Sequence, residues 1–339
     1  MSAGQAPEAP LAVLGAGSWG TALAIQLARN GRPARLWGRD ARRQAAMAAD
    51  RRNERYLSGS HFPDSLTVEP HLGLALQGAS DVLIAVPSHA FRPVLQEIRP
   101  HLDAKIRLAW ATKGFELESG LLPHQVAHEV LGTSRAVAVL SGPTFAREVG
   151  RGLPTAMTVA SSDAAFAKAL ANRLSSANFR AYTSQDIVGV EVGGALKNVL
   201  AVGAGLSDGL GFGANTRVAL ITRGLVEMMR LGVALGAERD TFMGLAGLGD
   251  LVLSCTDDQS RNRRFGLLLA AGRAPPEALA EIGQVVEGYS AAKAAREVAL
   301  REGIEMPLCA GIYRVLYEDT PAQEAVRELM GRPIRSETE

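Results

Sequence analysis

Lys197 is the residue with the clearest capacity for chemistry, because it interrupts a stretch that is otherwise almost entirely apolar and small. Within residues 188–206 the other polar side chains are Glu191 and Asn198. Burial disfavours the charged form of an amine and lowers its pKa from about 10.4, so we expect Lys197 to act as a base near neutral pH. A lysine that snorkels at a helix surface is the alternative. Because the apolar helix has no structural use for an amine, we also expect the fold to tolerate Lys197→Met.

A second cluster could hold an anion. Ser260 is the predicted N-cap of a helix that carries Arg261 and Asn262 in its first turn. Backbone N–H groups, the positive end of the helix dipole and a guanidinium group would meet there. A solvated arginine-rich face is the alternative, since three of the four residues 261–264 are arginine. Asp250 ends a glycine loop just upstream, and a role as a helix N-cap would by itself explain it.

The sequence GAGSWG, from Gly15 to Gly20, fits the pattern G-x-G-x-x-G. It lies between a predicted strand and a predicted helix, which is the context in which this motif binds a dinucleotide. Gly15 permits a tight turn, Gly17 lets the backbone approach a pyrophosphate, and Gly20 allows close packing of helix on strand. The pattern therefore predicts a cofactor site.

Polar residues also follow other predicted strands, at the edge of the sheet where ligands bind. Arg39 stands where a 2′-phosphate would be recognised, with Asp40 one step beyond. We therefore favour NADP(H), with NAD(H) left open, and Arg39 as a solvated cation is the alternative. Lys113 directly follows a buried strand and is expected to point towards the ligand, although lysines in such loops are commonly just solvated.

Short apolar runs that alternate with helical stretches predict a doubly wound parallel sheet. The chain after Asp186, a predicted N-cap, has helical patterns only. We therefore predict a Rossmann-like α/β domain over 11–188 and an all-α domain over 189–339, preceded by a disordered tail over 1–10. The predicted strands are 11–17, 34–40, 81–86, 106–111, 136–140, 155–161 and 179–184, and the first helix is 21–30. The predicted later helices begin with a long one from 187 and continue at about 216–236, 250–256, 260–271, 275–282, 288–302, 307–317 and 321–330.

Composition restricts the class of protein. A length of 339 residues favours two domains, and a formal net charge of +1 gives no case for binding nucleic acid or an anionic membrane. Cys255 and Cys309 are expected to be reduced and buried, as in a cytoplasmic protein. We see no signal peptide, no uninterrupted apolar stretch of about 18–20 residues, and no cluster with metal-ligand spacing. These features predict a soluble cytoplasmic protein without a metal.

Six segments together resemble bacterial NAD(P)-dependent glycerol-3-phosphate dehydrogenase over about residues 11–330, in the order found in that family. The sequence GALKN and the SRN segment are the most specific of these matches. The segments are GAGSWGTALA (15–24), ATKGFE (111–116), LSGPTFARE (140–148), EVGGALKNVLAVGAGLSDGLGFGANTRVALITRG (191–224), GLAGLGDLVLSCTDDQSRNRRFG (244–266) and QVVEG (284–288).

The resemblance implies reversible hydride transfer between NAD(P)H and dihydroxyacetone phosphate, giving sn-glycerol 3-phosphate for glycerophospholipid synthesis. Lys197 would be the proton acceptor, assisted by Lys113 and Asp250. The implied substrate ligands are Lys113, Gly142, Thr144, Lys197, Asp250, Ser260, Arg261 and Asn262. The implied cofactor ligands are Gly15, Gly17, Ser18, Trp19, Gly20, Arg39, Lys113, Ala146, Arg261, Val285 and Glu287.

Two alternatives stay open at this point. One is a dehydrogenase of the same architecture that acts on a 3-hydroxy acid or sugar acid, which would need carboxylate recognition in place of a phosphate clamp. The other is a non-catalytic NAD(P)-sensing protein, which would have no use for a proton acceptor. The sequence leaves a homodimer open as well.

Overall fold

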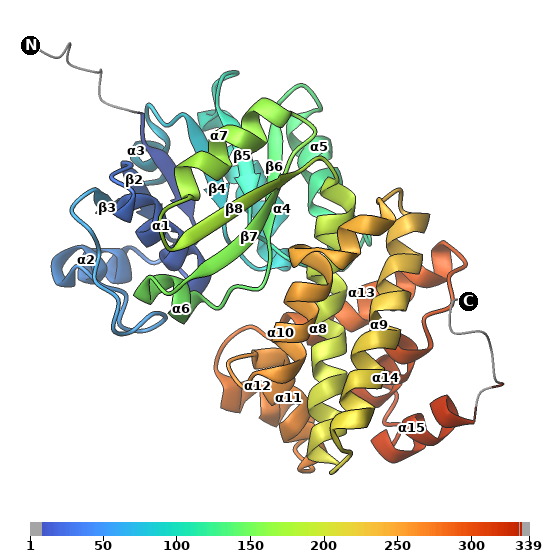
Figure 1. Ribbon diagram of the computed structural model, residues 1–339. Helices are drawn as coiled ribbons and strands as arrows, with labels where there is room; N and C mark the ends of the chain where they lie inside the picture. The colour runs from blue at the N-terminus through green and yellow to red at the C-terminus, as the bar shows by residue number, and fades with distance from the viewer. Residues whose placement is uncertain (1–8, 332, 334–339) are drawn as a thin grey trace, which may run out of the picture. The chain divides into compact units, whose positions relative to one another are not determined.

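The computed structural model describes residues 9–331 and 333, which form two compact units (Figure 1). The first unit contains the described residues up to Lys113 and Leu121–Glu191, and the second contains Gly114–Gly120 and the described residues from Val192 onwards. The first eight residues of the predicted tail lie outside the described part. The domain boundary predicted at 188–189 falls inside helix α8 (Ile187–Gly209).

The first unit is built on a sheet of eight strands within the described residues, in the order β3-β2-β1-β4-β5-β6-β7-β8. Its strands are parallel except that β7 runs antiparallel to β6, so the sheet is mixed and not wholly parallel as predicted. β3 was missed because its three residues give too short a pattern. The strands are β1 (Leu11–Leu14), β2 (Ala34–Trp37), β3 (Leu66–Val68), β4 (Asp81–Ile84), β5 (Arg107–Trp110), β6 (Val137–Ser141), β7 (Thr155–Ala160) and β8 (Phe179–Ser184).

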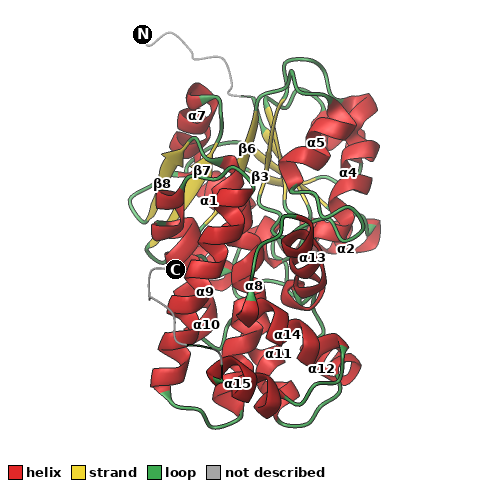
Figure 2. Ribbon diagram, turned by 90° about the vertical axis from the view of Figure 1, so that its right-hand side faces the viewer, coloured by secondary structure: helices red, strands yellow, loops and turns green. Residues whose placement is uncertain are grey.

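Helices cover both faces of this sheet, as expected for a doubly wound fold. Figure 2 shows the strands in yellow, with α1 and α7 on one side and α4 and α5 on the other. The helices of this unit are α1 (Ser18–Arg29), α2 (Ala41–Asp50), α3 (Leu72–Leu76), α4 (Phe91–Ile98), α5 (Pro123–Leu131), α6 (Ala146–Arg151) and α7 (Ala164–Leu174), with short 3₁₀ turns at Ser88–Ala90 and Arg99–His101.

A buried carboxylate, Glu191, ties the start of α8 to the sheet. Its oxygens accept hydrogen bonds from Trp110 Nε1 at 2.9 Å and from the His124 backbone N–H at 2.9 Å. The His124 ring nitrogen Nδ1 lies 2.5 Å from the same carboxylate. Burial raises the pKa of Glu191. Burial opposes the charged form of His124, but the ion pair with Glu191 outweighs it and raises the pKa of the imidazole. Glu191 is therefore an anchor for the fold.

The described part of the second unit is helical, which confirms the predicted fold class. The predicted N-cap of α8 is also confirmed, since Asp186 Oδ1 accepts from the Gly189 N–H at 2.7 Å. The predicted later helices agree closely with the observed ones. They are α9 (Ala214–Ala234), α10 (Asp250–Thr256), α11 (Arg261–Ala270), α12 (Pro275–Ile282), α13 (Glu287–Arg301), α14 (Pro307–Tyr317) and α15 (Ala322–Met330), with a 3₁₀ helix at Arg239–Met243 and a π turn at Leu245–Gly249.

Small residues on α8 let its neighbours pack against it closely. A Cβ atom at Gly193 would lie 2.5 Å from the Ala246 carbonyl oxygen, and one at Gly205 would collide with the backbone of Arg263. On the other side, a Cβ atom at Gly203 would lie 2.6 Å from Ile312 of α14. The core of the second unit is therefore organised around α8.

α8 contains no uninterrupted apolar stretch of about 18–20 residues, because Glu191 and Lys197 interrupt it. By length and composition, however, α8 is apolar enough to cross a membrane, with a mean hydropathy of 1.4 over an 18-residue window. However, 83% of that window is buried inside the protein. α8 is therefore the core helix of a soluble protein. The two cysteines, Cys255 and Cys309, are buried and free, as predicted.

Glu227 of α9 makes the stability of the second unit depend on pH. Its carboxylate is 3% exposed and accepts hydrogen bonds from the backbone N–H groups of Leu308 and Cys309, at 2.6 and 3.1 Å. Burial raises the pKa of Glu227 to about 7, although these donors oppose the shift. The folded state thus keeps a proton that the unfolded chain loses near pH 4.5. The stabilisation is complete below that pH and is lost as the pH rises through 7.

We therefore predict that Glu227→Gln removes this pH dependence, because the amide keeps an acceptor oxygen and cannot ionise. Between pH 4.5 and pH 8 the free energy of unfolding of the variant should gain about 3 kcal/mol relative to the parent. Chemical denaturation at several pH values measures this difference. Glu118→Gln, at an exposed position, is the control. A difference between parent and Glu227→Gln that stays constant with pH would contradict the prediction.

Candidate active site

Several predicted site residues lie at one edge of the sheet. Gly15 follows β1, Arg39 follows β2, Lys113 follows β5 and Gly142 follows β6. These four strands are parallel, so their carboxyl ends share an edge. The chain order reverses between β1 and β4, which is the position where open α/β sheets bind ligands.

The loop after β1 has the features that a dinucleotide needs. Gly15 has φ +116°, and a Cβ atom there would collide with the backbone of Ala85. A Cβ atom at Gly20 would collide with the carbonyl oxygen of Gly15, so both glycines are required by packing. At Gly17, by contrast, a Cβ atom would meet nothing within 4 Å. The space beside Gly17 is therefore open to a ligand.

The start of α1 offers donors to that space. The helix begins at Ser18, and no side chain caps its first turn. The indole Nε1 of Trp19 is buried and has no hydrogen-bond partner among the described residues. An uncapped helix N-terminus and a buried N–H without an acceptor fit an anionic group such as a pyrophosphate.

Asn53 supports this loop, and the sequence analysis missed it. Its side chain is 3% exposed, and its Nδ2 donates to the Ala16 carbonyl oxygen at 3.0 Å and to Thr21 Oγ1 at 2.8 Å. No local pattern marks this asparagine, because it reaches the loop from a segment that follows α2. Only the folded chain reveals its role.

Arg39 is exposed at the end of β2, and its neighbour Asp40 is engaged in local structure. The Asp40 carboxylate caps α2 by accepting from the Arg43 N–H at 3.1 Å, and it pairs with Arg43 Nε at 2.9 Å. A carboxylate used in this way is poorly placed to bind ribose hydroxyls as well.

The loop after β6 turns sharply at Gly142, which has φ +149°, and a Cβ atom there would lie 2.9 Å from Met157 Cα. Thr144 Oγ1 donates to the Gly142 carbonyl oxygen at 3.2 Å, and α6 begins two residues later at Ala146. After β5, Thr112 Oγ1 holds its loop by donating to the Val86 carbonyl oxygen at 2.8 Å. Lys113 follows as a half-buried cation.

In the second unit the structure brings Lys197 and Asp250 together. Lys197 is 9% exposed and Asp250 is 1% exposed. Lys197 Nζ donates to Asp250 Oδ1 at 2.7 Å and to Ser254 Oγ at 2.8 Å. The predicted burial of Lys197 is confirmed, but the sequence argument overlooked that the amine has a carboxylate partner.

Two expectations change as a result. Asp250 is not an N-cap, because it is the first residue of α10 and its cap position is Gly249. Lys197→Met would also destabilise the fold and not be tolerated as predicted, since it would leave the Asp250 carboxylate buried without the lysine cation. Ser254 was missed, although it lies four residues after Asp250 and hence on the same helical face.

The predicted helix start at Ser260, where the sequence analysis places an anion site, is confirmed. Ser260 Oγ accepts from the Arg263 N–H at 3.3 Å, and Ser260 is therefore the N-cap. The Asn262 side chain is engaged within the protein. Its Nδ2 donates to Asn198 Oδ1 at 2.7 Å, and its Oδ1 accepts from the Gly288 N–H at 2.9 Å. Asn262 thereby links α8, α11 and α13.

Arg261 lies beside the segment that precedes α13. Its Nη1 donates to Gln284 Oε1 at 3.3 Å, and burial lowers the pKa of its guanidinium, which nevertheless stays charged at physiological pH. Val285 is 39% exposed, and Glu287 opens α13. No group of three or more metal-ligating side chains occurs in the part of the chain that the structure describes.

Comparison with known proteins points to one family. The models for the N-terminus and the C-terminus of NAD-dependent glycerol-3-phosphate dehydrogenase match residues 10–167 and 186–327. Glycerol-3-phosphate dehydrogenase [NAD(P)+] of Edwardsiella ictaluri is 56% identical over 98% of each chain. The Methylococcus capsulatus protein of the same name is 57% identical over 96% of this chain and 98% of its own. The crystal structure of glycerol-3-phosphate dehydrogenase from Coxiella burnetii is 48% identical, covers 96% of this chain and 99% of its own, and superposes with a TM-score of 0.93.

We predict that Asn53→Ala weakens NAD(P)H binding, because it removes the hydrogen bond to the loop backbone at Ala16 and the one to the Thr21 hydroxyl of α1. Loss of buried hydrogen bonds costs about 1–3 kcal/mol, which corresponds to roughly a 5- to 150-fold rise in Kd if all of it is expressed in binding. Quenching of tryptophan fluorescence by NADPH measures the Kd. Asn178→Ala, which removes an exposed side-chain hydrogen bond to Gly152, is the control. Equal affinities for Asn53→Ala and the parent would show that Asn53 has no role at the loop.

Proposed function

The chain belongs to the NAD-dependent glycerol-3-phosphate dehydrogenase family and has glycerol-3-phosphate dehydrogenase [NAD(P)+] activity, and on that premise we propose that Lys197 is the acid and base of the reaction. The observation that supports this role is the buried ion pair of Lys197 with Asp250. The 3-hydroxy-acid dehydrogenase and the non-catalytic sensor are set aside, because the relatives that match almost the full length share one activity.

Lys197 would transfer the proton of the substrate oxygen. During reduction of dihydroxyacetone phosphate, its ammonium donates a proton to the oxygen that develops negative charge at C2. During oxidation of sn-glycerol 3-phosphate, the neutral amine accepts the C2 hydroxyl proton, and the Asp250 carboxylate stabilises the ammonium that forms. When bound, the nicotinamide supplies or takes up the hydride.

Ser254 holds the lysine in place for this transfer. Lys197 Nζ has three N–H donors when charged, and the bonds to Asp250 and Ser254 take up two of them. These bonds hold the long side chain in one conformation. An acid that must donate its proton to a single substrate atom needs such a fixed position.

The start of α11 would bind the phosphate of the substrate. The backbone N–H groups of the first turn and the Arg261 guanidinium supply the donors, and Ser260 keeps the helix end in place. The side-chain amide of Asn262 links three helices, so we assign it a positioning role. Substrate binding at this position is assigned to the backbone N–H of Asn262.

The cofactor contacts follow from the first unit and from the family resemblance. Gly15, Gly17, Ser18, Trp19 and Gly20 would hold the pyrophosphate, which is supported by the open space at Gly17 and the unpaired indole N–H of Trp19. The remaining assignments rest on the resemblance. Lys113 would contact both the substrate and the cofactor, and Gly142 and Thr144 would contact the substrate. The cofactor would also be contacted by Ala146, Arg261, Val285 and Glu287.

We place the enzyme in the cytoplasm, supplying glycerol 3-phosphate for glycerophospholipid synthesis. Two buried free thiols are consistent with a reducing compartment.

We predict that Lys197→Gln lowers kcat by roughly 10²–10⁴, the usual effect of removing a general acid or base. Glutamine can still donate a hydrogen bond towards Asp250, so this variant tests the proton transfer with less damage to the fold than Lys197→Met. The rate is followed by NADPH absorbance with dihydroxyacetone phosphate. Lys293→Gln, an exposed position in α13, is the matched control.

NADPH binding separates this result from misfolding. The Lys197→Gln variant should bind NADPH as the parent does, because the proposed pyrophosphate contacts lie in the first unit. Turnover within a few-fold of the parent, in a variant that folds and binds cofactor, would exclude Lys197 as the acid and base.

Coenzyme preference would depend on Arg39. Its exposed guanidinium and the engagement of Asp40 as a helix cap favour a 2′-phosphate over a free 2′-hydroxyl. We predict that Arg39→Ala weakens NADPH binding by about 1–3 kcal/mol and changes NADH binding much less. Kd values for both coenzymes measure the difference. A similar loss for NADH and NADPH would show that Arg39 does not recognise the 2′-phosphate.

A further inference from the structure

Asp208 lies near the end of α8 and binds two arginines from other helices. Its Oδ2 atom accepts from Arg263 Nη2 of α11 at 2.7 Å and from Arg217 Nη1 of α9 at 2.9 Å. The side chains of Asp208 and Arg263 are each 11% exposed. Buried ion pairs contribute little stability, because each charge gives up its hydration. The place of these charges in the fold indicates a further role.

Arg263 connects both sides of the start of α11. Its Nη1 donates to Asp258 Oδ1, in the turn before the helix, and its Nη2 reaches Asp208 on α8. Its backbone N–H donates to the N-cap, Ser260 Oγ, at 3.3 Å. Arg263 thus fixes the N-cap of α11, the turn that precedes it and the neighbouring α8. Asp208 supplies the α8 side of this connection.

Asp208 also shares a face of α8 with Lys197, the proposed acid and base. The two residues are 11 positions apart, which corresponds to about three helical turns, or about 16 Å. α11 packs along α8 between them (Figure 1), because a Cβ atom at Gly205 would collide with the backbone of Arg263. The position of α11 along α8 therefore sets how far its first turn lies from Lys197.

Two neighbouring residues of α11 hold that position from opposite directions. Asn262 Nδ2 donates to Asn198 Oδ1, next to Lys197, at 2.7 Å, whereas Arg263 reaches Asp208. Asn198 and Asp208 are ten residues apart, or about 15 Å along the helix. Contacts at two such distant points prevent α11 from sliding along α8.

We propose that Asp208 is a positioning residue for the substrate, a role that rests on the phosphate site and the acid–base residue proposed above. Through Arg263, Asp208 sets the distance between the start of α11 and Lys197 Nζ. Dihydroxyacetone phosphate has its phosphate at one end and the carbonyl that receives the proton at C2. A shift of the phosphate site by about 1 Å would move this carbonyl away from Nζ, and a misplacement of that size lowers a rate by as much as about 100-fold.

The proposal is tested by comparing dihydroxyacetone phosphate with dihydroxyacetone, which has the same carbonyl but no phosphate. Because Asp208 acts through the phosphate site, its loss should affect the first substrate and spare the second. Asp208→Asn removes the charge at nearly constant size. Arg263→Lys keeps a cation but cannot bridge Asp208 and Asp258. The value of kcat/KM is measured for both substrates with saturating NADPH, and the ratio of the two values cancels any loss of folded protein.

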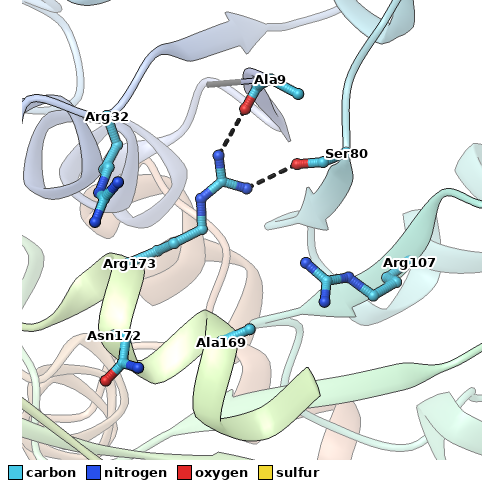
Figure 3. Close-up of a pocket in the computed structure, with 7 residues that line it drawn as sticks. All are labelled: Ala9, Arg32, Ser80, Arg107, Ala169, Asn172 and Arg173. Atoms are coloured by element: carbon cyan, nitrogen blue, oxygen red, sulfur yellow. Dashed lines mark hydrogen bonds between the residues drawn. The ribbon is translucent and has the colours of Figure 1, made fainter. Parts of the chain in front are cut away.

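A matched control is available in the first unit. Asp81 is 1% exposed and pairs with Arg107 and Arg173, each at 2.6 Å, so it is likewise a buried carboxylate between two arginines. It pairs in register with Arg107 at the amino ends of β4 and β5. Figure 3 shows Arg107 and Arg173 beside the pocket that they line at this edge of the sheet. Asp81→Asn therefore removes a comparable ion cluster outside the proposed site.

We expect Asp208→Asn and Arg263→Lys to lower kcat/KM for dihydroxyacetone phosphate by about 10- to 100-fold and that for dihydroxyacetone by less than about threefold. Asp81→Asn should change both values by the same factor. An equal loss on both substrates in Asp208→Asn, or no loss on either, would overturn the proposal. If Asp208→Asn does not fold, Arg263→Lys decides the question by the same criterion.

Two further variants separate failure of this inference from failure of the proposed function. Arg261→Ala should lose activity on dihydroxyacetone phosphate alone, and Lys197→Gln should lose activity on both substrates. If both variants behave in this way while Asp208→Asn keeps the parental ratio, only the positioning role is wrong. If Arg261→Ala keeps the parental ratio, the phosphate site at α11 is wrong, and the role of Asp208 is wrong with it.

Discussion

The ion pair between Lys197 and Asp250 is the interaction on which the proposed chemistry depends. Both residues are buried, with 9% of Lys197 and 1% of Asp250 exposed, so each side chain loses most of the hydration that stabilises its charge in water. Removing either partner would take the opposite charge away from the one that stays in the core, which is costly. A pair of this kind is a poor source of stability, because apolar residues of similar size would pack there at lower cost. The transfer of a proton to substrate provides a reason for retaining it.

This pair can form only because α8 allows close contact on several sides. Small residues bring the backbone before α10 against Gly193, and the backbone of α11 against Gly205. Each contact places one group of the proposed site. The first positions Asp250 opposite Lys197, and the second positions the helix end at Ser260. Asn262 then connects α11 to α8 and α13, so that these parts of the second unit are positioned together.

The first unit shows how one topology creates two different edges. Parallel strands place all of their carboxyl ends together and all of their amino ends together. At the carboxyl edge, glycine turns and an uncapped helix leave backbone N–H groups for an anion. At the amino edge, strand register alone sets Asp81 beside Arg107, and a buried carboxylate organises the cations around it. Backbone donors thus dominate one edge and guanidinium groups the other.

The sequence by itself determined the fold class, most element positions and the chemical character of the site. Hydrophobic period and glycine spacing are local properties, and they sufficed for β1, α1, the helices after α8 and the cap at Ser260. Local pattern could not reveal the antiparallel β7, because strand direction is decided by how the connecting segment returns to the sheet. Nor could it pair Lys197 with Asp250, or bring Asn53 to Ala16 and Asn262 to Gly288, since these residues meet only when separate segments pack. A residue type indicates what chemistry is possible, but its charge state and its partners depend on the tertiary contacts that replace water around it.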